Sequence, residues 1–430
     1  FAFATARGVA LWPQPIAVAG APTLADMDPS EGVGGTVVTL SGANFDPADG
    51  ATRVSLGGFP AAVRSVQPDA IQFVVPAQLA TGPVVVRVGG LVSNALLFNS
   101  LAPEGPDSWY QVVAGLNPSR RAAHTAVLRT ATHEMIIFGG STGNIFQPTT
   151  TTDLYAFNLD TFEWRDIADP ANGPGGRTFH SAVYLPDSDE MLVVGGNGAV
   201  AGGVFSDVWR YDFNLNTWTR EAEAIAGLAE RQGMPLVLHP ESGLVYAHGG
   251  ANRQGNPLNE TWTYDPATRQ WQQLQTNGGP PPARGVHVSV IAGNTLYVFG
   301  GQTALQPTPQ TVRGDTWALD LLTLTWRQIP GAGPSARAAT AGVYDEIGHR
   351  LVIYGGTQGQ QPFRDVWALD LDTETWADVT PADGLLPIRA NHTAVHLGRG
   401  NLMVVYGGIV DLANPQSPQI YQDVWVGNLE

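Results

Sequence analysis

The amino-acid sequence predicts an all-β protein in two parts, a small sandwich followed by a ring of six similar sheets. Short apolar runs rich in Val, Ile, Leu and Tyr alternate with Gly, Pro, Asn and Asp along the 430 residues, which is typical of strands and turns. From residue 107 onward the same features recur about every 50 residues, and such a period is typical of propellers. Residues 22–100 have strand-like runs without that repeat.

The first 21 residues predict an extended arm. Large and small side chains alternate over residues 1–12, so one face of an extended strand is bulky and the other is small. Pro13 and Pro15 interrupt the apolar stretch, which excludes a membrane helix. The arm docks either on its own chain or, as a donated strand, in a neighbouring subunit. Because the first residue is Phe1 and not Met, we expect that a leader was removed before it.

Residues 22–100 predict an antiparallel sandwich. The runs VVTLSGANF, VSLGGFPA, IQFVVP and GPVVVRVGG read as strands separated by Gly, Pro, Asn and Asp. The block from Gly34 to Phe45, GGTVVTLSGANF, resembles the IPT/TIG domain, an immunoglobulin-like module. That family occurs in surface receptors, bacterial surface and carbohydrate-active proteins, and transcription factors, so the resemblance implies a fold and no single function.

Three features recur together six times between residues 107 and 430. Each repeat opens with an arginine, continues with an apolar run that ends in a glycine pair, and then has an acid two residues before an aromatic residue. The arginines are Arg121, Arg177, Arg231, Arg284, Arg337 and Arg389, and the acids are Asp153, Asp207, Glu260, Asp315, Asp365 and Asp423. A second tryptophan closes five of the repeats. This combination resembles the kelch repeat, whose units each form a four-stranded propeller blade, and implies a six-bladed kelch propeller.

Trp109 predicts how the ring closes. The sixth repeat ends at Glu430 without its closing tryptophan, whereas Trp109 stands 12 residues ahead of Arg121, where the other closing tryptophans precede their next arginine. We therefore predict that the strand around Trp109 completes blade six and leaves no open edge between the first and last blades.

Composition narrows the setting. The net charge of −16 opposes binding to nucleic acid, which needs a basic face. The chain has no cysteine, so it forms no disulfide and no thiolate metal site, and all 22 basic residues are arginine. Only 14% of residues are charged, against a typical quarter, and Thr, Gln, Asn and Ser are common instead. We expect an extracellular or cell-surface protein without a membrane span.

Catalysis finds little support in the residues. Kelch propellers include copper-radical oxidases whose cofactor needs a cysteine joined to a tyrosine, and the absence of cysteine excludes that reaction. The iron-binding Glu-x-x-x-Asp-x-x-x-His spacing of kelch-type plant specifier proteins fits Glu374 and Asp378, but Ala382 stands where the histidine is needed. We predict no catalytic residues, no metal site and no cofactor.

A second motif, Arg-x-x-His, occurs in four of the repeats. Its histidines are His124, His180, His287 and His392. If the first strand of each blade lines the axial channel, they could form a ring that binds an anion, an acidic sugar or a metal, as in a mutarotase of the sialic-acid type. Arginine and histidine also belong to the ordinary kelch pattern, and six acids match six arginines, so we favour structural pairing within and between blades.

The partner site is predicted on the face that carries the long loops. In a four-stranded antiparallel blade, the connection between the second and third strands and the connection to the next blade emerge on one face. Here those loops are long and rich in Gln, Thr, Asn and Pro, whereas the opposite face has tight turns. The candidate binding residues are Phe146, Arg253, Arg313, Phe363, Arg364 and Tyr421.

These observations predict a non-catalytic extracellular or cell-surface scaffold that recognises a protein or a glycan through its long-loop face. Two alternatives remain. The chain could be a subunit of a self-assembling surface filament, a homopolymer that uses residues 1–12 as its donated strand. It could also be a carbohydrate-active enzyme such as a sialic-acid-type mutarotase.

Overall fold

The computed structural model of the chain describes residues 20–48, 51–76, 81–101, 108–112, 118–143, 148–168, 172–198, 203–225, 227–228, 230–304, 308–382, 384–410 and 419–429. Every regular secondary-structure element assigned in these residues is a β-strand, which confirms the all-β prediction. None of the described segments is a helix long and apolar enough to span a membrane. The arm predicted over residues 1–21 lies outside the described residues except for its last two positions.

The chain divides into two compact units. One consists of Phe1–Gly115 with Leu159–Glu163, and the other of Leu116–Asn158 with Trp164–Glu430. We describe each unit by itself.

The first unit contains the sandwich. Its strands are β1 (Thr23–Asp28), β2 (Glu31–Gly32), β3 (Val37–Ala43), β4 (Thr52–Leu56), β5 (Phe59–Val66), β6 (Ala70–Val74), β7 (Gly82–Val88), β8 (Leu91–Val92) and β9 (Leu96–Ser100). They follow the order β1-β3-β6-β5-β4-β7-β9-β2, with β8 beside β7. The pairs are antiparallel apart from the short β2–β9 contact.

The sandwich core comes from alternate residues of its strands. Successive side chains of a strand point to opposite faces, so every second residue is buried. The fully buried residues at alternating strand positions are Val38, Leu40, Leu56, Ile71, Phe73, Val84, Val86 and Phe98, and Val75, just after β6, is fully buried as well. This alternation is the one that the apolar runs of the sequence predict.

The second unit is built from four-stranded sheets, which we call blades one to six. Blade one contains β11 (Thr125–Arg129), β12 (Glu134–Phe138), β13 (Leu154–Asn158) and β14 (Glu163–Asp166). Blade two contains β15 (Ser181–Leu185), β16 (Glu190–Val194), β17 (Val208–Asp212) and β18 (Thr217–Ala222). Blade three contains β19 (Leu236–Leu238), β20 (Val245–His248), β21 (Thr261–Asp265) and β22 (Gln270–Gln273). Each blade keeps its strands in sequence order.

Blades four to six repeat the arrangement. Blade four contains β23 (Val288–Ala292), β24 (Thr295–Phe299), β25 (Thr316–Asp320) and β26 (Thr325–Ile329). Blade five contains β27 (Ala341–Asp345), β28 (Arg350–Tyr354), β31 (Val366–Asp370) and β32 (Thr375–Asp378). Blade six contains β33 (Thr393–Leu397), β34 (Leu402–Tyr406) and β35 (Val424–Asn428). The sixth sheet has the order β10-β35-β34-β33, where β10 is Trp109–Gln111, a strand from the segment counted with the first unit. A short hairpin, β29 (Thr357–Gln358) with β30 (Gln361–Pro362), lies in the long loop of blade five.

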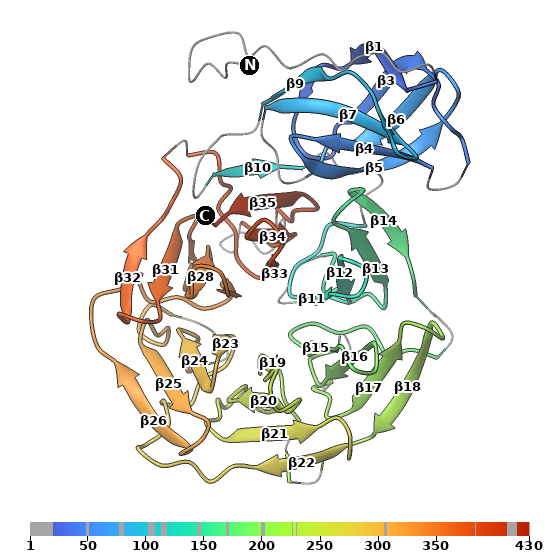
Figure 1. Cartoon of the computed structure of the whole chain (residues 1–430). Helices are drawn as coiled ribbons and strands as arrows, with labels where there is room; N and C mark the ends of the chain where they lie inside the picture. Colours follow the sequence, from blue (N-terminus) through green and yellow to red (C-terminus); the bar gives the residue numbers. More distant parts are fainter. Residues whose placement is uncertain are drawn as a thin grey trace. The chain divides into compact units, whose positions relative to one another are not determined.

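The blades form a closed ring with the first strand of each nearest the axis (Figure 1). Each first strand contacts the first strands of both neighbouring blades, and β11 of blade one contacts β33 of blade six. The second strands are buried on both faces, because blades stack on either side of them. The predicted six-bladed propeller is confirmed.

The first prediction concerns Trp109, which is 1% exposed. Trp109→Ala removes a large buried ring from the fourth strand of the sixth sheet, and we expect a loss of about 3–5 kcal/mol in unfolding free energy. Urea unfolding followed by tryptophan fluorescence measures it. Trp209→Ala in the partly exposed position of blade two should cost less. An equal or smaller loss for Trp109→Ala would contradict a structural role for β10.

Candidate functional site

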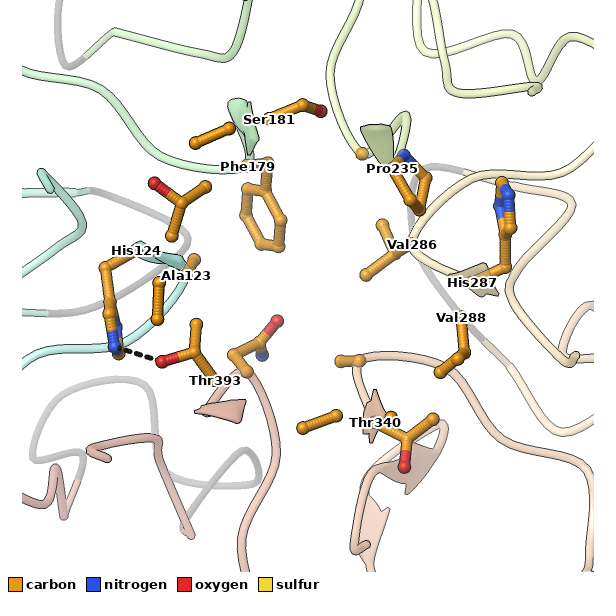
Figure 2. Close-up of a pocket in the computed structure, with 18 of the residues that line it drawn as sticks. Ala123, His124, Phe179, Ser181, Pro235, Val286, His287, Val288, Thr340 and Thr393 are labelled. Carbon is orange, nitrogen blue, oxygen red and sulfur yellow. Dashed lines mark hydrogen bonds between the residues drawn. The ribbon is translucent and has the colours of Figure 1, made fainter. Parts of the chain in front are cut away.

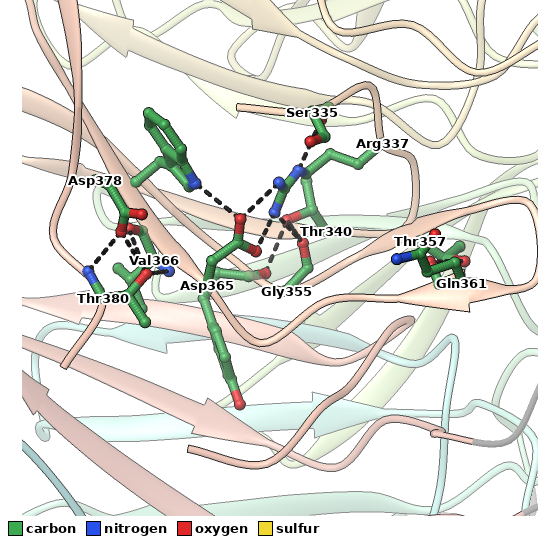
Figure 3. Close-up of polar contacts among 12 residues, drawn as sticks. Ser335, Arg337, Thr340, Gly355, Thr357, Gln361, Asp365, Val366, Asp378 and Thr380 are labelled. Atoms are coloured by element: carbon green, nitrogen blue, oxygen red, sulfur yellow. Dashed lines mark hydrogen bonds and ion pairs between the residues drawn. The ribbon is translucent and has the colours of Figure 1, made fainter. Parts of the chain in front are cut away.

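Each repeated arginine is the centre of a buried hydrogen-bond network within its own blade. In blade five, Arg337 Nη1 donates to the carbonyl oxygen of Gly355 at 3.0 Å and to Asp365 Oδ1 at 2.6 Å (Figure 3). Its Nη2 donates to Asp365 Oδ2 at 2.8 Å and its Nε donates to the carbonyl of Ser335 at 3.0 Å. The indole N–H of Trp367 donates to the same carboxylate at 2.8 Å. The acid-x-aromatic motif therefore places an acceptor between a guanidinium and an indole.

The other five blades repeat this ion pair, as the one-to-one match of acids and arginines predicts. The pairs Arg121–Asp153, Arg177–Asp207, Arg231–Glu260, Arg284–Asp315 and Arg389–Asp423 have N–O distances between 2.7 and 3.0 Å. Burial by itself raises the pKa of Asp207, Asp315 and Asp365, but the hydrogen bonds and charge of the partner arginine lower the pKa overall. These carboxylates stay ionised and are engaged inside their blades.

Aromatic loop residues cover three of these arginines. The guanidinium carbons of Arg177, Arg337 and Arg389 lie over the rings of Phe205, Phe363 and Tyr421 at 4.4, 4.3 and 4.6 Å from the ring centres. Cation–π contacts at this distance are favourable. Phe363 and Tyr421, which the sequence places among the binding residues, therefore pack on the arginines of their own blades.

The same arginines also join neighbouring blades through their backbone. The second glycine of each pair donates its N–H to the carbonyl oxygen of the next blade's arginine, for example Gly140 to Arg177 at 2.9 Å and Gly408 to Arg121 at 2.9 Å. All six blades make this bond. Each repeated arginine therefore links the strands of its own blade through its side chain and accepts a hydrogen bond from the preceding blade through its main chain.

A second circle of hydrogen bonds surrounds the axis. The residue two positions after each arginine has a positive φ. Its N–H donates to the carbonyl oxygen of the equivalent residue in the preceding blade, over N–O distances of 2.8–3.1 Å. The six members are Ala123, Phe179, Gly233, Val286, Ala339 and Asn391. The bond from Ala123 to Asn391 closes the circle between blades one and six.

The Arg-x-x-His histidines lie between blades. His124 Nε2 is 2.8 Å from Thr393 Oγ1 of blade six, and His180 Nε2 is 2.8 Å from Thr125 Oγ1 of blade one. Figure 2 shows the rings of His124 and His287 turned away from the centre of the channel. Burial, followed by the nearby arginine charges, holds the pKa of His124 well below its usual value. These imidazoles are neutral packing groups.

Each of these rings packs on the residue before the glycine pair of the preceding blade. The contacts are edge-to-face or steeply tilted, with ring centres 4.9–5.7 Å apart. They join His124 to Tyr406, His180 to Phe138, His287 to His248 and His392 to Tyr354. His248 therefore occupies an aromatic packing position, and its Nδ1 is 3.1 Å from Thr261 Oγ1.

The second prediction tests the space at the glycine pair. A Cβ added to Gly249, where φ is +66°, would lie 2.5 Å from the Arg284 carbonyl oxygen, whereas one added to Gly243, where φ is +68°, would meet nothing within 4 Å. Gly243→Ala should cost only the backbone strain, about 1 kcal/mol, and Gly249→Ala about 2–4 kcal/mol because strain and overpacking add. Equal losses in thermal unfolding would contradict close packing between blades.

The axial channel is narrow at its long-loop end. Its cavity there has a volume of about 240 Å³ and is lined by the positive-φ circle and the starts of the first strands. The side chains of Phe179 and Val286 point into it (Figure 2). Among the described residues, its lining contains no Asp or Glu, and no group of three or more His, Cys, Asp or Glu could hold a metal. This end offers no acid–base pair for sugar ring opening.

The channel widens to about 930 Å³ at the opposite end, where the tight turns lie. All six first strands contribute to this wide cavity, and residues such as Pro186, Pro266 and Arg269 of the turns form its rim. Small residues, including Ala126, Ser289 and Gly342, line both the narrow and the wide parts. A concave site of this size is typical of ligand-binding pockets.

The remaining loop candidates lie in different blades, and no contact joins them in the described residues. Phe146 lies outside the described residues. Arg253 is half exposed and 3.6 Å from Glu230, Arg364 is exposed and donates to the Gly384 carbonyl at 3.1 Å, and Arg313 is partly buried. The structure does not assemble them into one site.

Sequence reasoning missed the residues of the wide cavity. Asp187 and Asp265, together with Tyr344, line it from turns and strand ends that the sequence identifies only as tight connections. The sequence contains no separate signal for them, because Pro, Asp and Ser are ordinary turn residues and Pro186–Asp189 has the composition of a tight turn.

Four-stranded blades, a buried arginine–acid pair in each and a closed ring define a β-propeller of the kelch class. The profile of the KLHDC2/KLHL20/DRC7 Kelch-repeats domain matches residues 105–301 and 287–430, and that of the IPT/TIG domain matches residues 22–100. The chain therefore belongs to the kelch-repeat family and carries an N-terminal IPT/TIG domain. Such a combination is typical of a protein-binding scaffold.

Curated relatives match about half of this chain. The acyl-CoA-binding domain-containing protein 4 of Arabidopsis thaliana is 30% identical over 257 residues, which are 57% of this chain and 37% of that protein. The Rab9 effector protein with kelch motifs of Mus musculus is 32% identical over 213 residues, 47% of this chain and 53% of the relative. Its Homo sapiens counterpart is 31% identical over 211 residues, which are 47% of this chain and 55% of that relative. The chain spans about half the length of the curated relatives it matches, or less.

Proposed function

We propose that this chain is a non-catalytic scaffold that holds a segment of a partner protein in the wide cavity of its propeller. The observation that carries this proposal is the cavity itself, about 930 Å³ in volume and lined by all six blades. Ligand-binding pockets usually have volumes of about 300–1,000 Å³. The repeated arginines and histidines are engaged in the fold, which leaves the cavity as the best-formed site.

A protein partner fits the residues better than a glycan. Sugars are commonly held by exposed aromatic rings, and no tryptophan in the described part of the chain is exposed. The name Rab9 effector protein with kelch motifs also refers to a protein partner for those relatives. The lining of the narrow cavity has no carboxylate, which disfavours the mutarotase alternative at the Arg-x-x-His histidines, whereas the wide cavity is lined by His396 together with Asp187, Glu190 and Asp265.

An extracellular or cell-surface location is part of this proposal. Its support is compositional, namely a charged fraction of 14% with Thr, Gln, Asn and Ser common instead. Antibody labelling of intact and permeabilised cells tests it, because a surface protein is labelled without permeabilisation. The filament alternative depends on residues 1–12, which lie outside the described residues. Light scattering tests it by comparing the mass in solution of the intact chain with that of a chain without residues 1–20.

Photo-cross-linking tests where the partner binds. A benzoylphenylalanine replaces the exposed Ala267 at the cavity rim, Arg364 on the long-loop face or Asp69 in the sandwich, and the protein is irradiated in the cells that make it. We expect a protein adduct from position 267 and none from position 69. Adducts from position 364 alone would move the site to the long-loop face, and no adduct from either face would contradict the binding function.

A further inference from the structure

One wall of the wide cavity carries three carboxylates. Asp187 lies in the β15–β16 turn, Glu190 begins β16 and Asp265 ends β21. Asp187 is exposed, and no hydrogen bond or ion pair from another described residue engages its carboxylate. Hydrogen bonds from the Thr268 side chain and the Ala267 N–H lower the pKa of Asp265, so it stays ionised.

Behind this wall two glutamates share one arginine. Arg210 is 5% exposed and donates to Glu190 Oε2 and Glu221 Oε2, each at 2.5 Å. The hydroxyl of Tyr264 donates to Glu221 Oε1 at 2.7 Å. Burial by itself lowers the pKa of Arg210, but Tyr264 and the two glutamates raise it overall, so the guanidinium stays charged. One guanidinium neutralises one of the two carboxylates, and a negative charge remains.

The charges on this side of the cavity do not balance. Three carboxylates and two guanidinium groups line this side, and Glu221 behind the wall adds a fourth carboxylate, which gives a net charge of −2 within a chain of net charge −16. The carboxylates are Asp187, Glu190, Glu221 and Asp265, and the guanidinium groups are those of Arg210 and Arg269. In a concave site such an excess attracts cations and repels acidic partners.

Other blades contribute an apolar part of the same cavity. Ile291 of blade four and Val343 and Tyr344 of blade five line it. A lysine or arginine side chain has an apolar stem and a charged tip. The stem can pack on these residues, the ring of Tyr344 offers a cation–π surface, and the tip can reach the carboxylates.

We propose that the partner segment held in the wide cavity carries a basic side chain, arginine or lysine, and that Asp187, Glu190 and Asp265 receive its charge. This inference rests on the proposed binding function of the cavity and adds the chemistry of the partner to it. Charge complementarity gives specificity, because an acidic segment in the same position would place like charges together.

A random heptapeptide phage library tests the inference. It is selected on the full chain and, in parallel, on Ala267→Trp, whose indole is placed at the cavity rim. Peptides enriched on the natural chain over Ala267→Trp are expected to contain arginine or lysine. The affinity of one such peptide, measured by fluorescence anisotropy, should fall about tenfold on Asp187→Asn/Asp265→Asn, since two charges are lost while the amides keep the shape. Replacing its arginine by citrulline should do the same, and Asp69→Asn in the sandwich should change nothing.

The outcomes separate the two proposals. Enriched peptides that are acidic or uncharged, or whose affinity is unchanged by Asp187→Asn/Asp265→Asn, would overturn the basic partner and leave the binding function standing. Selection that enriches the same peptides on Ala267→Trp, or enriches none, would overturn both.

Discussion

Replacing Asp365 by alanine is expected to lower the unfolding free energy of the propeller by about 3–5 kcal/mol. Arg337 is fully buried, and the substitution leaves its charge without a counter-ion. The indole N–H of Trp367 loses its acceptor at the same time. The loss is large because removing one partner of a buried pair leaves the desolvated charge of the other uncompensated.

Asp372→Ala in the same blade is the matched control. Its carboxylate is 77% exposed and pairs only with His349, so its loss should stay below about 1 kcal/mol. Urea unfolding of both variants at pH 7.5 measures the difference. Equal losses would mean that the repeated arginine–acid pair is not what holds a blade together.

Stability is expected to fall steeply as the pH is lowered from 6.5 to 5. Five buried histidines have a pKa lowered by burial and are neutral in the fold: His124, His180, His248, His287 and His392. Burial, followed by the charges of Arg284 and Arg231, lowers the pKa of His248 to about 3. In the unfolded chain each of the five has a pKa near 6.5. Below that pH the unfolded state binds more protons, so their contribution is complete above pH 6.5 and is lost as the pH falls.

Each buried histidine can remove up to about 1.4 kcal/mol per pH unit below its unfolded pKa. Urea midpoints at pH 7.5, 6.5, 5.5 and 5.0 measure the sum. His248→Phe should reduce the pH dependence of the urea midpoint by the contribution of one proton, because it removes one buried imidazole. The fold should accept the phenyl ring, since blades one and four carry Phe138 and Phe299 at that position. A midpoint that stays constant from pH 7.5 to 5.0 would show that these imidazoles are charged or solvated in the fold.

The sequence could predict whatever depends on periodicity within one repeat. The ring of six blades, the strand before each glycine pair and the pairing of arginine with the acid of its own repeat all follow from features that recur at fixed spacing. Asp365 and Arg337 are 28 residues apart, but the same spacing recurs with small changes in every repeat, which indicated the contact.

Contacts between repeats could not be predicted in the same way. His180 packs on Phe138 of the preceding blade, and nothing within a single repeat shows in which direction a side chain leaves the first strand. Within a repeat, the sequence also does not show how the long loops fold, and these loops place Phe363 and Tyr421 over the buried arginines of their own blades. Their role in binding stays a prediction.

The wide cavity is lined by side chains from all six blades, among them Asp187 and Asp265, and no pattern within one repeat shows that they line one space. Asp265 itself occupies a turn position that other repeats fill with Asp212, Asp320 and Asp370.

Nitrogen-15 NMR of the histidine side chains tests most directly whether the repeated arginines and histidines hold the ring together and bind no ligand. The account predicts that the imidazoles of His124, His180, His287 and His392 stay neutral down to pH 5.5, for as long as the propeller is folded, and do not respond to added phosphate or sialic acid. Titration of these rings near pH 6.5, or a shift on adding either anion, would contradict it and restore the channel ring as a binding or catalytic site.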